Sequence, residues 1–91
     1  MRLPKMSQWD LLLIEWVDSA GGDSGWHKPK KKELEIDGCI TVGMVYAQSP
    51  DRIAMVLSRD TANDQVDSVI TIPTCAITGY TRLKAAPKPA A

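Results

Sequence analysis

The segment from Ile40 to Ser58 constrains the fold most, because its apolar side chains alternate on both sides of one tight turn. Ser49-Pro50-Asp51-Arg52 suits a type I β-turn, since proline fixes φ at the second position. Every second residue on either side is apolar: Ile40, Val42, Met44 and Tyr46 share one face before the turn, and Ile53, Met55 and Leu57 follow it. A period of two is typical of β-strands. The segment therefore predicts a hairpin, which would be refuted if Met44 and Met55 both pointed into water.

Two more short strands are expected after this hairpin. A polar loop over residues 59–67 leads to a β-branched strand at 68–72, which Pro73 must end or place at a sheet edge. Thr74-Cys75-Ala76 can form one 3₁₀ turn, and residues 77–82 form the closing strand. Within the hairpin itself, Gly43 and Ala47 predict a sharp bend or the close approach of another backbone.

Upstream of the hairpin, the segment from Trp9 to Val17 is apolar at odd and even positions alike. Leu12, Ile14 and Trp16 would point to one side of a strand, and Leu11, Leu13 and Val17 to the other. A strand covered on both faces is favoured, but a helix with Ser7 as its N-cap stays open. Asp18 to Lys32 then forms a long loop, because its glycines and proline interrupt regular structure. Asp37-Gly38 is a turn signal.

These elements predict an all-β fold, a small five-stranded SH3-like or Sm-like barrel with a long first loop and one 3₁₀ turn before the last strand. A chain of 91 residues makes one domain with little core, and barrel closure would hide most of its strand edges. We assign residues 1–8 to a flexible N-terminus, 9–83 to the barrel domain, and 84–91 to a disordered tail of Pro, Ala and Lys.

The charge balance argues against a nucleic-acid-binding domain, and the cysteine spacing argues against a zinc protein. Eleven basic and eleven acidic residues give a formal charge of zero, whereas nucleic-acid-binding domains usually have a basic excess. Cys39 and Cys75 belong to no CxxC pair, which excludes a zinc site of ordinary spacing, so no metal or cofactor is expected. Thiols in a reducing cytosol are favoured, and a disulfide stays open. Leu11 to Ile14 is too short for a secretory or membrane segment, which favours a cytoplasmic protein.

Two segments are candidates for binding a partner. In the long loop, Trp26 and His27 precede a lysine run, and an aromatic ring beside phosphate-binding lysines suits single-stranded nucleic acid. The run consists of Lys28, Lys30, Lys31 and Lys32, and the alternative is a solvated loop. On the first strand, Leu11, Leu13 and Val17 form an outer apolar row that needs a cover, and an exposed Trp9 at the start of the strand would anchor this row. Trp26 could fold back as that cover, or a second subunit or a partner protein could supply it.

Catalysis is not expected. Asp18, Ser19 and His27 include the residue types of a hydrolase triad, but Ser19 follows no strand-turn-helix elbow, and no oxyanion donor can be named.

Short pieces of the chain resemble a group of small, mostly uncharacterised phage and prophage proteins. The pieces are Glu15-Trp16-Val17-Asp18-Ser19, Gly25-Trp26, Ile40-Thr41-Val42-Gly43-Met44-Val45, Ile72-Pro73 and Ala76-Ile77. The resemblance implies a compact β protein of viral origin with no agreed activity. The span from Ile40 to Leu57 is also similar to the central hairpin of Sm-like proteins, which form rings and bind RNA, but their base-reading loop is missing here.

Together these observations predict a non-catalytic interaction module of phage or prophage type. Its expected partner is a host or phage protein or a second copy of the chain, in the host cytoplasm and away from membranes. Binding of single-stranded RNA or DNA through the lysine-rich loop is the alternative, and a structural component of a virion is a third possibility.

Overall fold

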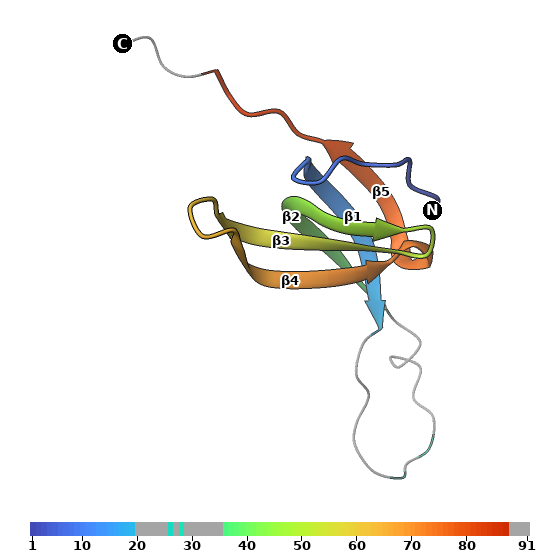
Figure 1. Ribbon diagram of the computed structural model, residues 1–91. Coiled ribbons are helices and arrows are strands. Elements are labelled where there is room, and N and C mark those ends of the chain that lie inside the picture. The colour runs from blue at the N-terminus through green and yellow to red at the C-terminus, as the bar shows by residue number, and fades with distance from the viewer. Residues whose placement is uncertain (20–25, 27, 29–35, 88–91) are drawn as a thin grey trace.

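The computed structural model describes residues 1–19, 26, 28 and 36–87, which form one five-stranded antiparallel sheet (Figure 1). The elements are β1 (Leu11–Ser19), β2 (Ile36–Ser49), β3 (Arg52–Asp60), β4 (Gln65–Pro73), the 3₁₀ turn η2 (Thr74–Ala76) and β5 (Ile77–Arg82). The strand order is β4-β3-β2-β1-β5, so β4 and β5 are the two edges and the sheet is not closed. The described residues contain no α-helix. The all-β prediction and the 3₁₀ turn are confirmed, and the helix left open for the first element is excluded.

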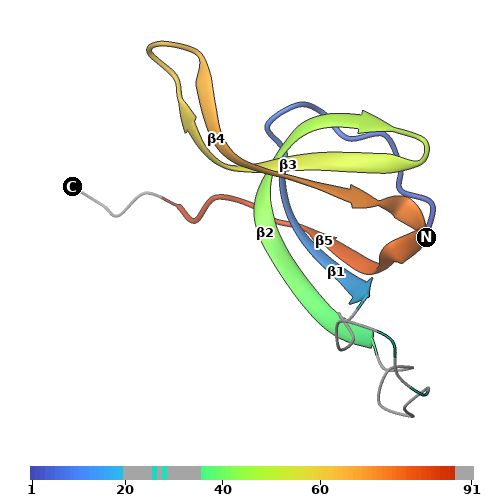
Figure 2. The ribbon, with the colours of Figure 1, turned by 90° about the horizontal axis from the view of Figure 1, so that it is seen from below.

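The long strand β2 joins the two halves of the sheet. Its first half pairs with β1 and its second half with β3, and Figure 2 shows how it arcs from one to the other. The register shifts between Val45 and Ala47, which leaves Tyr46 as the extra residue of a β-bulge. The turn predicted at Asp37-Gly38 is wrong, because Gly38 pairs with Val17 and the ladder continues beyond it.

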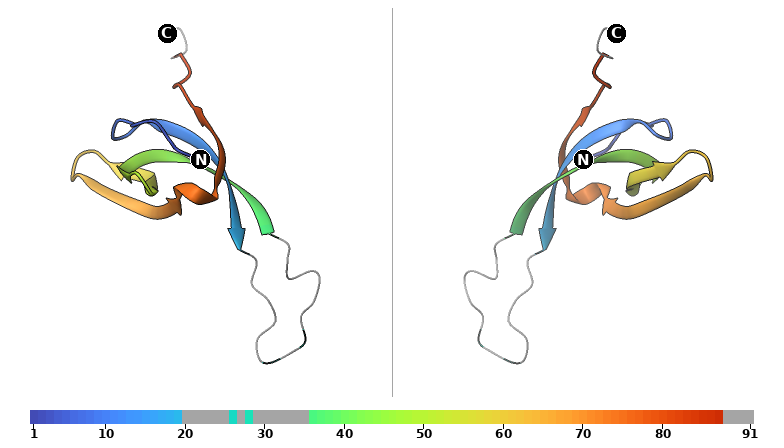
Figure 3. Two further views of the ribbon diagram at one scale, coloured as in Figure 1. Left: turned by 90° about the vertical axis from the view of Figure 1, so that its right-hand side faces the viewer. Right: turned by 90° about the vertical axis from the view of Figure 1, so that its left-hand side faces the viewer.

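The hairpin of β3 and β4 is longer than the sequence predicted. The polar loop expected over residues 59–67 shrinks to a short turn, because β3 runs to Asp60 and β4 begins at Gln65. The Asp60 carboxylate accepts hydrogen bonds from the Ala62 amide and the Asn63 side chain, and the Asn63 bond is the main reason that its pKa lies below the ordinary value. This closed turn lets the hairpin project from the rest of the sheet (Figure 3).

The core is aliphatic and lies on one face of the sheet. Its buried members come from all five strands and from the N-terminal segment: Leu3, Met6, Leu12, Ile14, Val45, Ile53, Met55, Ile72 and Ile77. Trp16 packs against them, and its indole Nε1 donates to the Thr41 hydroxyl at 3.0 Å. Met55 is fully buried and Met44 is half-buried, so the two side chains do not both point into water, and β2 and β3 pair as the predicted hairpin.

The N-terminal segment packs onto the sheet, although the sequence analysis assigned residues 1–8 to a flexible end. Leu3 and Met6 are buried in the core. The Gln48 side chain holds the segment from β2: its Oε1 accepts from the Met6 amide at 2.8 Å, and its Nε2 donates to the Pro4 carbonyl at 2.9 Å. The terminal ammonium of Met1 donates to the Thr74 carbonyl of η2 at 2.8 Å. The segment therefore spans from the β2 bulge to η2 (Figure 1).

The turn between β2 and β3 gives a pH-dependent prediction. Hydrogen bonds from Arg52 and Ser49, with the charge of Arg52, lower the pKa of Asp51 from 3.8 to about 2. A carboxyl whose pKa is lowered by folding stabilises the fold above its unfolded pKa and loses that effect as the pH falls through the folded pKa. We expect the difference in unfolding free energy between the wild type and Asp51→Asn to be constant above about pH 4 and to shrink between about pH 4 and 2.

Urea denaturation at a series of pH values measures this difference. High salt should reduce it, because the Asp51 and Arg52 side chains are both exposed. A difference that does not change between pH 5 and pH 2 would show that the ion pair does not form.

Candidate functional site

The side of the sheet that faces away from the core carries a continuous apolar surface. Directly paired residues of an antiparallel sheet point to the same face, and Leu13 pairs with Val42. Leu12 and Ile14 point into the core, so their neighbours on β1 point outward. We call the apolar residues of this side the outer face: Leu11, Leu13, Val17, Ile40, Val42, Met44, Val56 and Val69. The sequence prediction of an outer row at Leu11 and Leu13 thus identified one part of a larger surface.

One row of the outer face crosses four strands. Leu11 pairs with Met44, Met44 with Val56, and Val56 with Val69. Val56 is buried without belonging to the core cluster, so it forms the floor of this row. The first half of β2 adds the most exposed members, since Ile40 is 67% exposed and Val42 is 51% exposed. Apolar side chains that are contiguous and exposed to this degree are typical of a binding surface.

The outer face has little charge. Among the outward positions of β1 and β2 that the structure describes, Glu15 is the one ionisable side chain, and it pairs with Ile40. The described positions of β1 and β2 on this face offer no cation to a phosphate group. It can bury apolar side chains of another protein, with Glu15 supplying a polar contact at one side.

Trp9, predicted as an exposed anchor, lies instead in a half-buried cluster before β1. Its backbone has φ 73°, an uncommon conformation for a non-glycine residue, and its amide donates to the Val45 carbonyl at 2.7 Å. The Arg59 guanidinium lies 4.0 Å from the centre of the Trp9 ring, and the Tyr46 ring lies 6.1 Å from it. Trp9 therefore connects the turn end of the β3–β4 hairpin, where Arg59 pairs with Val66, to the bulge of β2.

We expect Arg59→Met to lower the unfolding free energy by about 1 kcal/mol, because it keeps the aliphatic packing and removes the cation from the Trp9 ring. Arg59 also lies 3.5 Å from an Asp64 carboxylate oxygen, but the Asp64 side chain is 82% exposed. Asp64→Asn is therefore the control and should change stability little. Urea denaturation followed by tryptophan fluorescence measures both. Equal losses in the two variants would assign the effect to the ion pair.

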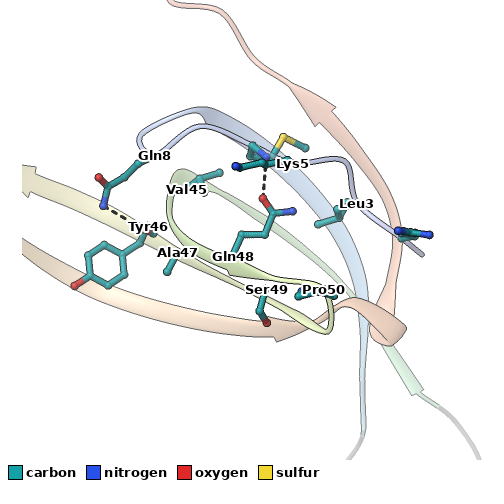
Figure 4. A pocket seen from close by; sticks show the side chains of 11 residues that line it. Leu3, Lys5, Gln8, Val45, Tyr46, Ala47, Gln48, Ser49 and Pro50 are labelled. Atoms are coloured by element: carbon teal, nitrogen blue, oxygen red, sulfur yellow. Dashed lines mark hydrogen bonds between the residues drawn. The ribbon is translucent and has the colours of Figure 1, made fainter.

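A groove of about 430 Å³ lies between the N-terminal segment and the second half of β2 (Figure 4). Leu3 and Val45 line its inner part, Tyr46 and Gln8 stand at one end, and Pro50 stands at the other. Sequence reasoning missed this groove because it treated one of its walls as a flexible end. Among the residues that line the groove, the alternating apolar pattern that ends at Tyr46 was the one sequence signal that could have indicated the groove.

Between β1 and β2, the structure describes two residues of the lysine-rich loop, Trp26 and Lys28. Trp26 is fully exposed, so the prediction that its ring folds back to cover the outer apolar row is wrong. Lys28 is exposed as well. His27, Lys30, Lys31 and Lys32 lie outside the described residues, and their part in a binding site stays a prediction.

The described residues show neither a disulfide nor a group of metal ligands. No disulfide joins Cys39 and Cys75. Within the described ranges, no three His, Cys, Asp or Glu side chains are grouped so that they could hold a metal ion. Those ranges also include no helix with the length and apolarity needed to cross a membrane.

Comparison of the chain with protein-family models, with curated proteins and with solved structures gave no match.

Proposed function

We propose that this domain is a non-catalytic protein-binding module that docks a partner protein onto the outer face of β1 and β2. The observation that carries the proposal is the exposure of Ile40 and Val42, two large aliphatic side chains on the half of β2 that pairs with β1. Burial of apolar area on this scale contributes about 25 cal/mol per Å² and is the main favourable effect in most protein association.

The charge distribution favours protein over nucleic acid as the partner. Eleven basic residues are balanced by eleven acidic ones, and the outer face of β1 and β2 presents Glu15 and no cation among its described positions. Affinity for a phosphate backbone comes mainly from Lys and Arg contacts. A partner that buries apolar side chains against Ile40 and Val42 fits this surface better.

The strand order and the 3₁₀ turn before β5 support an SH3-like or Sm-like barrel as the finer description of the fold. The phage or prophage origin, and a place in the host cytoplasm, belong to the same proposal and rest on the sequence alone. A role as a virion component would be tested by the presence of the protein in purified particles.

The test is capture of a partner by three forms of the protein from nuclease-treated host lysate. The wild type should retain a protein that Ile40→Glu with Val42→Glu does not retain. Thr61→Glu with Ala62→Glu adds the same charge in the exposed β3–β4 turn and should retain it, because this turn lies away from the outer face. Retention by all three forms would contradict the proposal, and so would retention by the wild type only from lysate that has not been treated with nuclease.

A second candidate function rests on Trp26. Its fully exposed ring precedes exposed Lys28, and an aromatic ring beside a lysine suits stacking with a single-stranded base. Titration of the protein with oligothymidylate should then quench tryptophan fluorescence, and Trp26→Ala should abolish the binding. Equal affinity of Trp26→Ala and the wild type would reject this function.

A further inference from the structure

The groove between the N-terminal segment and β2 is a separate surface from the outer face, and its walls are fixed in place. Gln48 bonds the Met6 amide and the Pro4 carbonyl at once, and the Gln8 side chain donates to the Tyr46 carbonyl at 3.2 Å. These bonds hold the segment beside β2 without closing the space between them (Figure 4). A volume of about 430 Å³ lies in the range of preformed ligand sites.

The groove has an uncompensated positive charge. Arg2 and Lys5 line it, both side chains are exposed, and neither forms an ion pair or side-chain hydrogen bond within the described part of the chain. The described residues of the lining include no carboxylate. Just outside the lining, the Asp51 carboxylate is already engaged by Arg52 at 3.2 Å and by the Ser49 hydroxyl at 2.6 Å. A chain with no net charge thus presents a locally cationic groove.

Apolar surface accompanies the two cations. Ala47 and Pro50 are exposed in the groove, and the Tyr46 ring is held at the bulge beside Trp9. A ligand that matches both features carries carboxylates next to aliphatic side chains. An open groove of this kind, bordered by extended backbone, suits a stretch of polypeptide better than a compact small molecule.

From this complementarity we propose that the groove binds an extended peptide segment of a partner protein in which acidic and aliphatic residues alternate. The acidic side chains pair with Arg2 and Lys5, and the aliphatic ones cover Tyr46, Ala47 and Pro50. The domain then has two independent contact surfaces, an apolar one on the outer face and a cationic one in the groove. This inference does not depend on the function proposed for the outer face.

Fluorescence anisotropy with a labelled peptide of alternating Glu and Leu tests the inference on the full chain. We expect saturable binding to the wild type and about tenfold weaker binding to Arg2→Glu with Lys5→Glu. Lys28→Glu with Lys84→Glu makes the same change in net charge away from the groove and should bind as the wild type does. Ile40→Glu with Val42→Glu should also bind normally, which separates this site from the outer face.

Three outcomes would overturn the inference. The first is equal weakening by the groove variant and its charge-matched control, which would indicate a non-specific charge effect. The second is equal binding of a peptide of alternating Glu and Ser, or of Lys and Leu, since either lacks half of the proposed match. The third is full competition by octanoate at the affinity of the peptide, which would assign the groove to a free carboxylate. Circular dichroism of each variant confirms that the sheet is retained in the comparison.

Discussion

Ile53→Ala should lower the unfolding free energy by about 2–5 kcal/mol, the range found for truncation of a buried aliphatic side chain. Ile53 has no exposed surface, and it pairs with Ile72 across β3 and β4 while Gln48 lies opposite it on β2. Its removal leaves a cavity between these strands that the sheet cannot collapse to fill. A domain this small has a total stability near the lower end of about 5–15 kcal/mol, so the variant should be partly unfolded at 37 °C.

The matched control is Ile40→Ala, which removes the same atoms from a side chain that is 67% exposed. We expect it to cost less than about 1 kcal/mol. Urea denaturation of both variants gives the comparison directly. Similar losses would mean that the two side chains are equally buried, and a larger loss for Ile40 would mean that the two faces of the sheet have been assigned the wrong way round.

Gly43→Ala should be destabilising by about 1–3 kcal/mol, although alanine is ordinarily the better residue in regular structure. A Cβ atom at Gly43 would lie 2.8 Å from the Val56 carbonyl oxygen, and backbone atoms of a paired strand cannot move aside as a side chain can. The substitution must push β3 away from β2 near the bulge.

Two other glycines provide the controls for this prediction. A Cβ at Gly38 meets no atom within 4 Å, so Gly38→Ala should be neutral or slightly stabilising. A Cβ at Gly79 would lie 2.7 Å from a carboxylate oxygen of Glu15, but that exposed side chain can rotate away. We therefore expect the highest melting temperature for Gly38→Ala, an intermediate one for Gly79→Ala and the lowest for Gly43→Ala. A Gly43→Ala protein as stable as the wild type would show that β2 and β3 are not in close contact.

Local patterns were enough to predict the centre of the fold. Pro50 at the second position of a turn and alternating side chains around it define the β2–β3 hairpin, and both features act within a few residues. The close backbone approach at Gly43 was also predicted, because a strand interior rarely includes glycine without such a reason. The 3₁₀ turn at Thr74 to Ala76 follows from Pro73, which cannot continue a central strand.

Long-range contacts account for what the sequence did not predict. Leu3 and Met6 show no sequence period, and their burial in the core depends on Gln48, which bonds the Met6 amide and the Pro4 carbonyl from a distant strand. The Asp37-Gly38 pair suits a turn in isolation, but β1 is long enough to extend the ladder through it. The bulge at Tyr46 changes which side chains face the core along β2, and no local signal fixes its position.

The sequence predicted one part of the candidate site and missed the rest. The outer row at Leu11 and Leu13 could be predicted because the odd- and even-numbered positions of this strand are both apolar. Both faces of such a strand need to be covered. Ile40 and Val42 could be placed on the same face as Leu11 and Leu13 only from the register of β1 and β2. The sequence predicted an exposed Trp9, whereas the ring is half-buried. Its backbone conformation and its contact with Arg59 depend on partners that are distant in the sequence, so no local pattern could indicate them.

The most direct test of the proposed function is a methyl NMR titration of the domain with the protein captured by its wild-type form. The account predicts that the methyl signals of Ile40 and Val42 shift or broaden as the complex forms, because these side chains become buried. The methyl signals of Ile53 and Ile72, in the core, should stay in place. A complex that forms while the Ile40 and Val42 signals remain unchanged would contradict the claim that this face is the binding surface.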